Sequence, residues 1–136
     1  MPVPILKQGT YLIASVQSAL TDADTERLQS DLMSQVSKYR AQGIIVDVTA
    51  IDVMDSFAAR SLRTIAHMTQ LRGAETVIVG LQPEVAFAMV QLGLTFEDMH
   101  TALDLEEGLA WLNRKASAKH RHQHHHQLRD GRDSGR

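Results

Sequence analysis

The stretch GIIVDVTAIDVMDSFAAR (residues 43–60) contains a strand, a turn and the start of a helix, and this order decides the fold. Its first part, GIIVDV (43–48), is a continuous apolar and β-branched run, which is typical of a strand covered on both faces. After Ser56 the apolar residues follow helical spacing as far as Gly73, so we predict a helix there. The residues that share one face of this helix are Phe57, Leu62, Ile65, Ala66 and Thr69.

Strands and helices also alternate on both sides of this stretch. Downstream, ETVIVG (75–80) predicts a second buried strand, PEVAFAMVQLG (83–93) a short helix, and residues 96–102 a weaker strand. Residues 104–115 predict a last helix. Upstream, residues 21–43 predict an amphipathic helix, because apolar residues recur there at spacings of four, four and three (Leu28, Leu32, Val36 and Tyr39).

Two short apolar runs at the N-terminus, residues 3–6 and 11–16, predict a β-hairpin with Gly9 in its turn. The full order is then β-β-α-β-α-β-α-β-α. Strands that alternate with helices indicate a mostly parallel central sheet covered by helices, and the hairpin adds an antiparallel edge. We therefore expect a single α/β domain with a mixed, mostly parallel sheet.

The ends of the helices carry recognisable local signals. Thr21 with Asp24 three residues later predicts a capping box at the start of one helix, and Gly43 predicts its end. Asp104 and Glu107 predict a second capping box.

Composition restricts the class of protein. The length of 136 residues suits one domain, and the absence of cysteine excludes disulfides and thiol catalysis. Residues 1–114 carry eight bases against fourteen acids and show no basic stripe, so we expect no nucleic-acid partner. No apolar stretch approaches the roughly 20 residues that span a bilayer. We therefore expect a cytoplasmic protein with no membrane partner.

The end of the chain differs from the rest. Residues 115–136 hold six bases and two acids and lose apolar periodicity, so we predict a domain over residues 1–114 and a disordered, basic, His-rich tail after it. We expect no metal site in the domain. The cluster of His122, His124, His125 and His126 leaves metal binding by the tail as an alternative function.

The motifs of common enzymes are missing. Ser56 lies in M-D-S-F-A and not in the G-x-S-x-G of a hydrolase, and His67, eleven residues later on the same helix, would lie roughly 16 Å away. Neither of the common phosphate-binding loops occurs. We therefore expect no enzymatic activity and no cofactor.

The turn that precedes the second helix is the candidate functional site. Ser56 is predicted to be its N-cap, and the uncharged first turn leaves N–H groups and the helix dipole available to a dianion. A phosphate on Ser56 would be attracted by the helix and repelled by Asp52 and Asp55. We predict phosphorylation of Ser56, with Thr49 as a weaker second candidate.

A partner docked on this turn would respond to such a phosphate. Phe57 and Ala58 are expected to contact it together with the two acids, Asp52 and Asp55. Phosphorylation would then add charge and bulk within the contact and release the partner.

Several segments together resemble the STAS family of anti-sigma-factor antagonists: VPILK, YLIASVQSAL, GIIVDVT, IDVMDSFAAR, GAETVIVGLQPEVAFAMVQLG and TALDLEEGL. The resemblance covers about residues 3–114. The D-S-F at the turn, where a general antagonist of the family would more often have D-S-S-G, favours the RsbS-like branch, the single-domain scaffolds of the bacterial stressosome.

The resemblance implies a STAS fold and a phospho-switch. The family's phosphoacceptor serine, at the start of the second helix, maps by motif onto Ser56. The implied partners are an RsbT-like serine kinase that is released by phosphorylation, a phosphatase that reverses it, and RsbR-like STAS paralogues in a large, self-associating complex. A direct anti-sigma-factor antagonist, regulated through the same serine, is the alternative within the family. The His-rich tail departs from the family pattern, and no family function is carried over to it.

Overall fold

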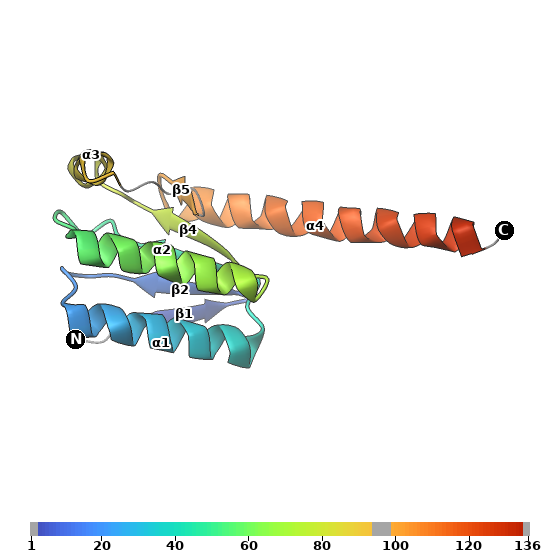
Figure 1. Cartoon of the computed structure of the whole chain (residues 1–136), viewed down its shortest axis with the longest axis horizontal. Helices are drawn as coiled ribbons and strands as arrows, with labels where there is room; N and C mark the ends of the chain where they lie inside the picture. Colours follow the sequence, from blue (N-terminus) through green and yellow to red (C-terminus); the bar gives the residue numbers. More distant parts are fainter. Residues whose placement is uncertain (1–2, 94–98, 135–136) are drawn as a thin grey trace.

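The predicted order of strands and helices is confirmed by the computed structural model, which describes residues 3–93 and 99–134, with side chains as far as residue 119. Nine elements follow one another along the chain (Figure 1): β1 (Ile5–Gln8), β2 (Tyr11–Ser15), α1 (Asp22–Tyr39), β3 (Gly43–Asp47), α2 (Ser56–Leu71), β4 (Glu75–Val79), α3 (Pro83–Gln91), β5 (His100–Ala102) and α4 (Leu105–Ser134).

The five strands form one sheet in the order of the sequence, β1-β2-β3-β4-β5. β1 and β2 are antiparallel, with Leu6 opposite Ile13, and the turn between them contains Gly9 in the left-handed region at φ 60°. The remaining neighbours are parallel. Because each parallel step requires a crossover, the helices between the strands must pack on the sheet. The expected mixed, mostly parallel sheet is therefore confirmed.

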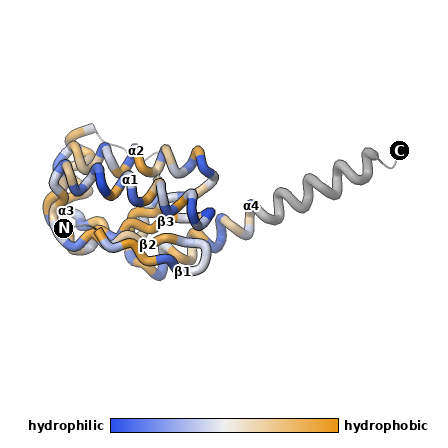
Figure 2. Tube along the Cα trace, turned by 90° about the horizontal axis from the view of Figure 1, so that it is seen from below, coloured by the Kyte–Doolittle hydropathy of each residue, from blue (hydrophilic) through white to orange (hydrophobic). Residues whose placement is uncertain are grey.

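One face of the sheet is covered by α1 and α2, which lie side by side (Figure 1). Every second residue of the inner strands points to this face, as the two-residue period of a strand requires. β2 and β3, which carry much of this core, are largely orange in Figure 2. The main residues packed here are Leu12, Ala14, Ile44, Val46 and Ile78 from the sheet, Leu28, Leu32 and Val36 from α1, and Leu62, Ile65 and Ala66 from α2.

The opposite face is covered by the first turns of α4. Leu112 packs there with the alternate strand residues Ile13, Ile45 and Val77. α4 lies very close to the sheet: a Cβ added to Gly108 would be 2.8 Å from a methyl group of Val79. The glycine therefore makes room for the sheet, at a position where helix propensity alone would favour another residue.

The predicted end of the first helix is wrong. α1 ends before Gly43, since Arg40 takes the left-handed conformation at φ 50° and its N–H bonds to the Val36 carbonyl. Gly43 belongs to β3, where an added Cβ would be 2.8 Å from the Leu112 side chain, so that glycine serves the packing of α4.

The capping box of Thr21 and Asp24 is confirmed. At α4, Asp104 accepts a hydrogen bond from the Glu107 N–H at 2.9 Å.

The C-terminal part of the chain also differs from expectation. Residues 115–134, for which disorder was predicted, continue α4 as a helix that extends beyond the sheet (Figure 1). The segment contains no proline, and Lys, Ala, Arg, Gln and Leu, which have good helix propensity, make up half of it, so no strong helix breaker stops α4 at residue 115. Of the predicted strand 96–102, residues 100–102 form β5, and residues 94–98 lie outside the described residues. Within the described residues, no helix is long and apolar enough to cross a membrane.

Candidate functional site

The predicted site lies at the carboxyl end of β3, where an eight-residue loop leads from the strand into α2. Hydrogen bonds hold the start of this loop. Asp47 accepts from both the backbone N–H of Thr49, at 3.0 Å, and its hydroxyl, at 2.6 Å. The Gln82 side chain donates to the Thr49 carbonyl at 2.9 Å and so ties the loop to the start of α3. Asp47 thus has the structural role of a carboxylate at the end of a strand.

Gly80 allows this loop to lie close to the end of β4. Its φ of 76° is in the left-handed region, and a Cβ there would overlap the Thr49 hydroxyl and lie 2.9 Å from the Thr49 Cβ. The path of the loop toward α2 is therefore fixed by the neighbouring strand as well as by its own sequence.

The N-cap of α2 is Asp55 and not Ser56, which corrects the prediction. Asp55 has extended backbone angles, and its Oδ1 accepts a hydrogen bond from the Ala58 N–H at 2.7 Å. Its carbonyl accepts the first helical bond, from the Ala59 N–H at 3.1 Å. The carboxylate thus satisfies one of the N–H groups that the sequence alone left to an external anion, and it places negative charge at the positive end of the helix dipole.

Ser56 is the first residue of α2 and is half-buried. Within the part of the chain that the structure describes, its hydroxyl makes no hydrogen bond, in contrast to the hydroxyl of Thr49. No side-chain polar atom of the described residues is both buried and unsatisfied, so the hydroxyl is open to water. Ser56 therefore presents a reactive group that the fold itself does not use.

The side chains around Ser56 divide into exposed and buried ones. Asp52 and Asp55 are exposed, as is Phe57 at 40%, so these three predicted partner contacts lie on the surface. Ala58 is only 5% exposed and faces the core, because Phe57 and Ala58 point to different sides of the helix, so the expectation that Ala58 contacts a partner is not met by the structure. Val53, which we did not predict as part of the site, is 68% exposed beside them.

A second exposed apolar surface lies on α3, next to the start of α2. Ala59 of α2 packs against Val85 and Met89 of α3. The opposite side of α3 exposes Phe87 at 65% and Val90 at 73%. Sequence reasoning missed these residues, although a short helix that is apolar on both sides is a usable signal of a contact surface.

The histidines form no site in the described part of the chain. His67 is exposed, and the ring of His100 stacks on Trp111 with centroids 4.3 Å apart. No group of three potential metal ligands occurs among the described residues. The side chains of His122, His124, His125 and His126 lie outside the described residues.

Comparison with known proteins places this geometry in a family. The model of the STAS domain matches residues 3–108. RsbT co-antagonist protein RsbRA of Bacillus subtilis is 30% identical over 89 residues, which are 63% of this chain and 32% of the relative. RsbRD of the same organism is 32% identical over 92 residues, 65% of this chain and 33% of the relative. The chain thus spans about a third of the length of these curated relatives.

Solved structures agree with this placement. A serine-to-glutamate variant of RsbS from Moorella thermoacetica is 31% identical, with a TM-score of 0.75 over 85% of this chain and 97% of that one. A chain from a solved structure of the stressosome is also 31% identical, with a TM-score of 0.71 over 83% of this chain and 98% of that one. The fold is shared with the anti-sigma-factor antagonist SpoIIAA, at 12% identity and a TM-score of 0.63. The chain belongs to the STAS family, and its structure is that of an RsbS-like STAS domain.

Proposed function

We propose that the protein is a non-enzymatic phospho-switch scaffold of a stressosome-like complex. It holds an RsbT-like serine kinase and releases it when Ser56 is phosphorylated. The similarity to RsbS and to a stressosome chain supports the scaffold role, and relatives named as RsbT co-antagonists support the kinase as partner. Thr49 is the weaker second candidate for phosphorylation, since its hydroxyl already donates to Asp47.

The observation that carries this proposal is the free hydroxyl of Ser56 at the start of α2, bordered by exposed apolar side chains. Val53 and Phe57 lie within three residues of it and are 68% and 40% exposed. A partner that covers these side chains therefore also covers the hydroxyl. The kinase would transfer the terminal phosphoryl group of ATP to the Ser56 oxygen: the new P–O bond replaces the bond to the β-phosphate, ADP leaves, and the hydroxyl proton passes to a base of the kinase or to water.

Phosphorylation would weaken the contact through charge and hydration. A phosphate adds about 1.5 to 2 negative charges to a turn that already holds Asp52 and Asp55. The start of α2 attracts that charge, so the fold tolerates it, although Asp55 already occupies the Ala58 N–H. A partner seated on Val53 and Phe57 would have to strip water from the dianion, and this cost favours release.

The same relatives support the proposed assembly partners, which are RsbR-like STAS paralogues and further copies of this chain. We also propose that a phosphatase restores Ser56 and that the complex is cytoplasmic. The domain is proposed to comprise residues 1–114, with the rest of α4 as an extension outside it.

Two measurements test this function. Phosphosite mapping by mass spectrometry, on protein isolated before and after stress, is expected to find phosphate on Ser56. Affinity for the purified RsbT-like kinase is expected to persist in Ser56→Ala and to fall in Ser56→Asp. Ser30→Asp, an exposed serine on α1, is the matched control for added charge. Equal kinase affinity of Ser56→Ala and Ser56→Asp would contradict the proposal.

The size of the assembly separates the scaffold from a direct antagonist. A scaffold is expected to form a large complex when mixed with its RsbR-like paralogues. If the chain instead remains a monomer or dimer in that mixture and binds an anti-sigma factor, it is a direct anti-sigma-factor antagonist, the class to which SpoIIAA belongs.

A further inference from the structure

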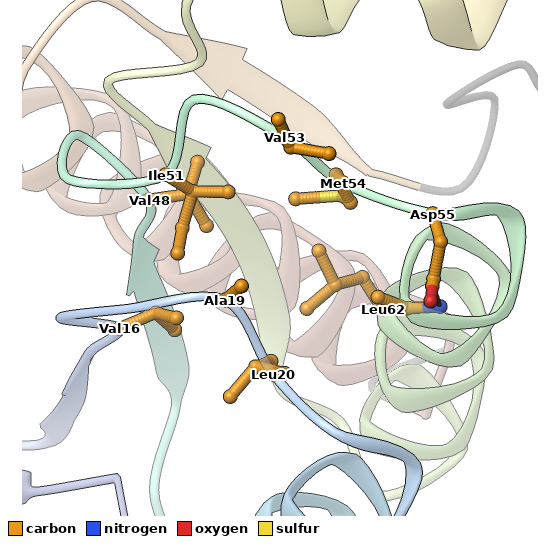
Figure 3. A pocket seen from close by; sticks show the side chains of 10 residues that line it. Val16, Ala19, Leu20, Val48, Ile51, Val53, Met54, Asp55 and Leu62 are labelled. Carbon is orange, nitrogen blue, oxygen red and sulfur yellow. Dashed lines mark hydrogen bonds between the residues drawn. The ribbon is translucent and has the colours of Figure 1, made fainter.

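A cavity of about 100 Å³ lies directly beneath the turn that carries Ser56. Figure 3 shows side chains from three parts of the chain that converge on it: the end of β2 with the loop after it, the end of β3 with its loop, and α2. Val16, Val48, Ile51 and Leu62 form its buried floor, each at most 4% exposed. The cavity therefore lies at the carboxyl ends of parallel strands, where ligands commonly bind in open α/β sheets.

The cavity can be reached from the surface. Ala19 and Val53, which also line it, are exposed. A ligand would therefore need no opening of the core to enter.

The lining restricts the chemistry of a ligand. Nine of the ten lining residues are apolar, and Asp55 is the only ionisable one. The Oδ1 of Asp55 already accepts a hydrogen bond from the Ala58 N–H. An anion would be repelled by this carboxylate and by Asp52 on the same loop, and any charged group would lose hydration without a new partner. An apolar cavity of about 150 Å³ is known to bind benzene, so a space of about 100 Å³ that is open to the surface limits the ligand to a single ring of that size.

The cavity also touches the switch. Asp55 and Ala58 both line it, and they are the two partners of the hydrogen bond that caps α2. Ser56 and Phe57 lie between them in the sequence. Any molecule in the cavity therefore contacts both ends of the turn that presents the Ser56 hydroxyl.

We propose that this cavity binds a small, neutral, apolar ring compound and that the bound compound alters how Ser56 is presented. The binding itself is independent of the proposed function. Only its consequence for signalling rests on Ser56 being the switch. Through this site a scaffold that lacks a catalytic centre would respond to a small molecule.

The test is a titration of the full-length, isotopically labelled protein, followed by NMR. Benzene is the probe, and benzoate, the same ring with a negative charge, is the matched control ligand. Benzene is expected to cause saturable shifts of the Val16, Ala19 and Ile51 amides, with shifts of Ser56 and Phe57 at the same midpoint. Benzoate is expected to cause none.

Variants locate the binding. Ala58→Leu, which adds volume from a fixed position on α2, is expected to abolish the benzene shifts, as is Ala19→Phe from the opposite side. Ala118→Leu, on an exposed position of α4, is expected to leave them unchanged. Thermal unfolding of each variant identifies any that fails to fold, and one folded filling variant suffices for the comparison.

Three results would overturn the proposal. Benzene shifts that do not saturate, or that persist in a folded filling variant, would exclude the site. Shifts of the lining residues without any at Ser56 and Phe57 would exclude the coupling. None of these results depends on whether Ser56 is phosphorylated, so this proposal and the proposed function can fail separately.

Discussion

The two long helices that lie side by side, α1 and α2, begin in different ways. At α1, Thr21 and Asp24 bond each other's backbone N–H reciprocally, at 3.1 and 3.2 Å. At α2, Asp55 alone bonds the Ala58 N–H, and the hydroxyl of the next residue, Ser56, is left over. At the start of α1, both capping side chains are therefore used in hydrogen bonds to the backbone. The start of α2 is capped by one residue, which leaves its neighbour free for another purpose.

The largest loss of stability is expected from a change that displaces the loop between β3 and α2. Gly80→Ala is expected to lower the free energy of unfolding by about 2–3 kcal/mol, since the new methyl group would overlap Thr49 and the left-handed conformation would be strained. Urea denaturation measures the loss. Gly9→Ala is the control, because Gly9 has a similar φ of 60° but open space around it, so only about 1 kcal/mol is expected. Equal losses would mean that the contact with Thr49 does not hold the loop.

Removal of each cap compares the two helix starts directly. Asp55→Ala is expected to cost about 1 kcal/mol, since it removes the whole side-chain cap of α2. Thr21→Ala is expected to cost less, because Asp24 still bonds the Thr21 N–H. Asp55→Asn keeps an acceptor and serves as control. A larger loss for Thr21→Ala than for Asp55→Ala, in urea denaturation, would contradict this difference.

Ser56→Ala tests whether the hydroxyl is truly unused. We expect the free energy of unfolding to change by less than about 0.5 kcal/mol, because no hydrogen bond within the described chain is lost. Chemical denaturation of Ser56→Ala beside Asp55→Ala checks this. A loss as large as that of Asp55→Ala would make Ser56 part of the cap after all.

The smallest expected effect is on the stability of the fold at low pH, through Asp24 at the start of α1. Hydrogen bonds from the backbone N–H and the hydroxyl of Thr21 hold the pKa of Asp24 below its ordinary value of 3.8. A carboxyl with a lowered folded-state pKa stabilises the fold above its unfolded pKa, and this contribution is lost as the pH falls through the folded pKa. Asp24→Asn is therefore expected to lose less stability than the unmodified chain on acidification below that value. Denaturant midpoints over a pH series measure this, and parallel curves for the two proteins would speak against it.

Much of the architecture could be predicted from the chain alone. The buried strands β3 and β4 are apolar on both faces, a pattern that only a covered parallel sheet requires, and α1 and α2 have clear helical periodicity. The turn before α2 could likewise be found, because an acid, a serine and an uncharged first turn follow a buried strand. These signals are local, and each lies within one or two elements.

The details of the site could not be predicted in the same way. Asp55 and Ser56 are equally good N-caps by residue type, and the cap belongs to whichever residue has extended backbone angles when the loop reaches the helix. That loop is fixed by Gly80 and Gln82, which are distant in sequence. The same holds for the cavity, since residues from three separate segments line it.

The local pattern of apolar, polar and cap-forming residues is thus sufficient for the order and type of the elements and for the position of the candidate switch, because these depend on hydrogen bonds and periodicities within a few residues. The identity of the cap, the burial of Ala58, the reason for Gly43 and the cavity under Ser56 depend on contacts between distant segments. Such contacts exist only once the sheet has brought β3, β4 and the helices together, and no single stretch of the chain encodes them.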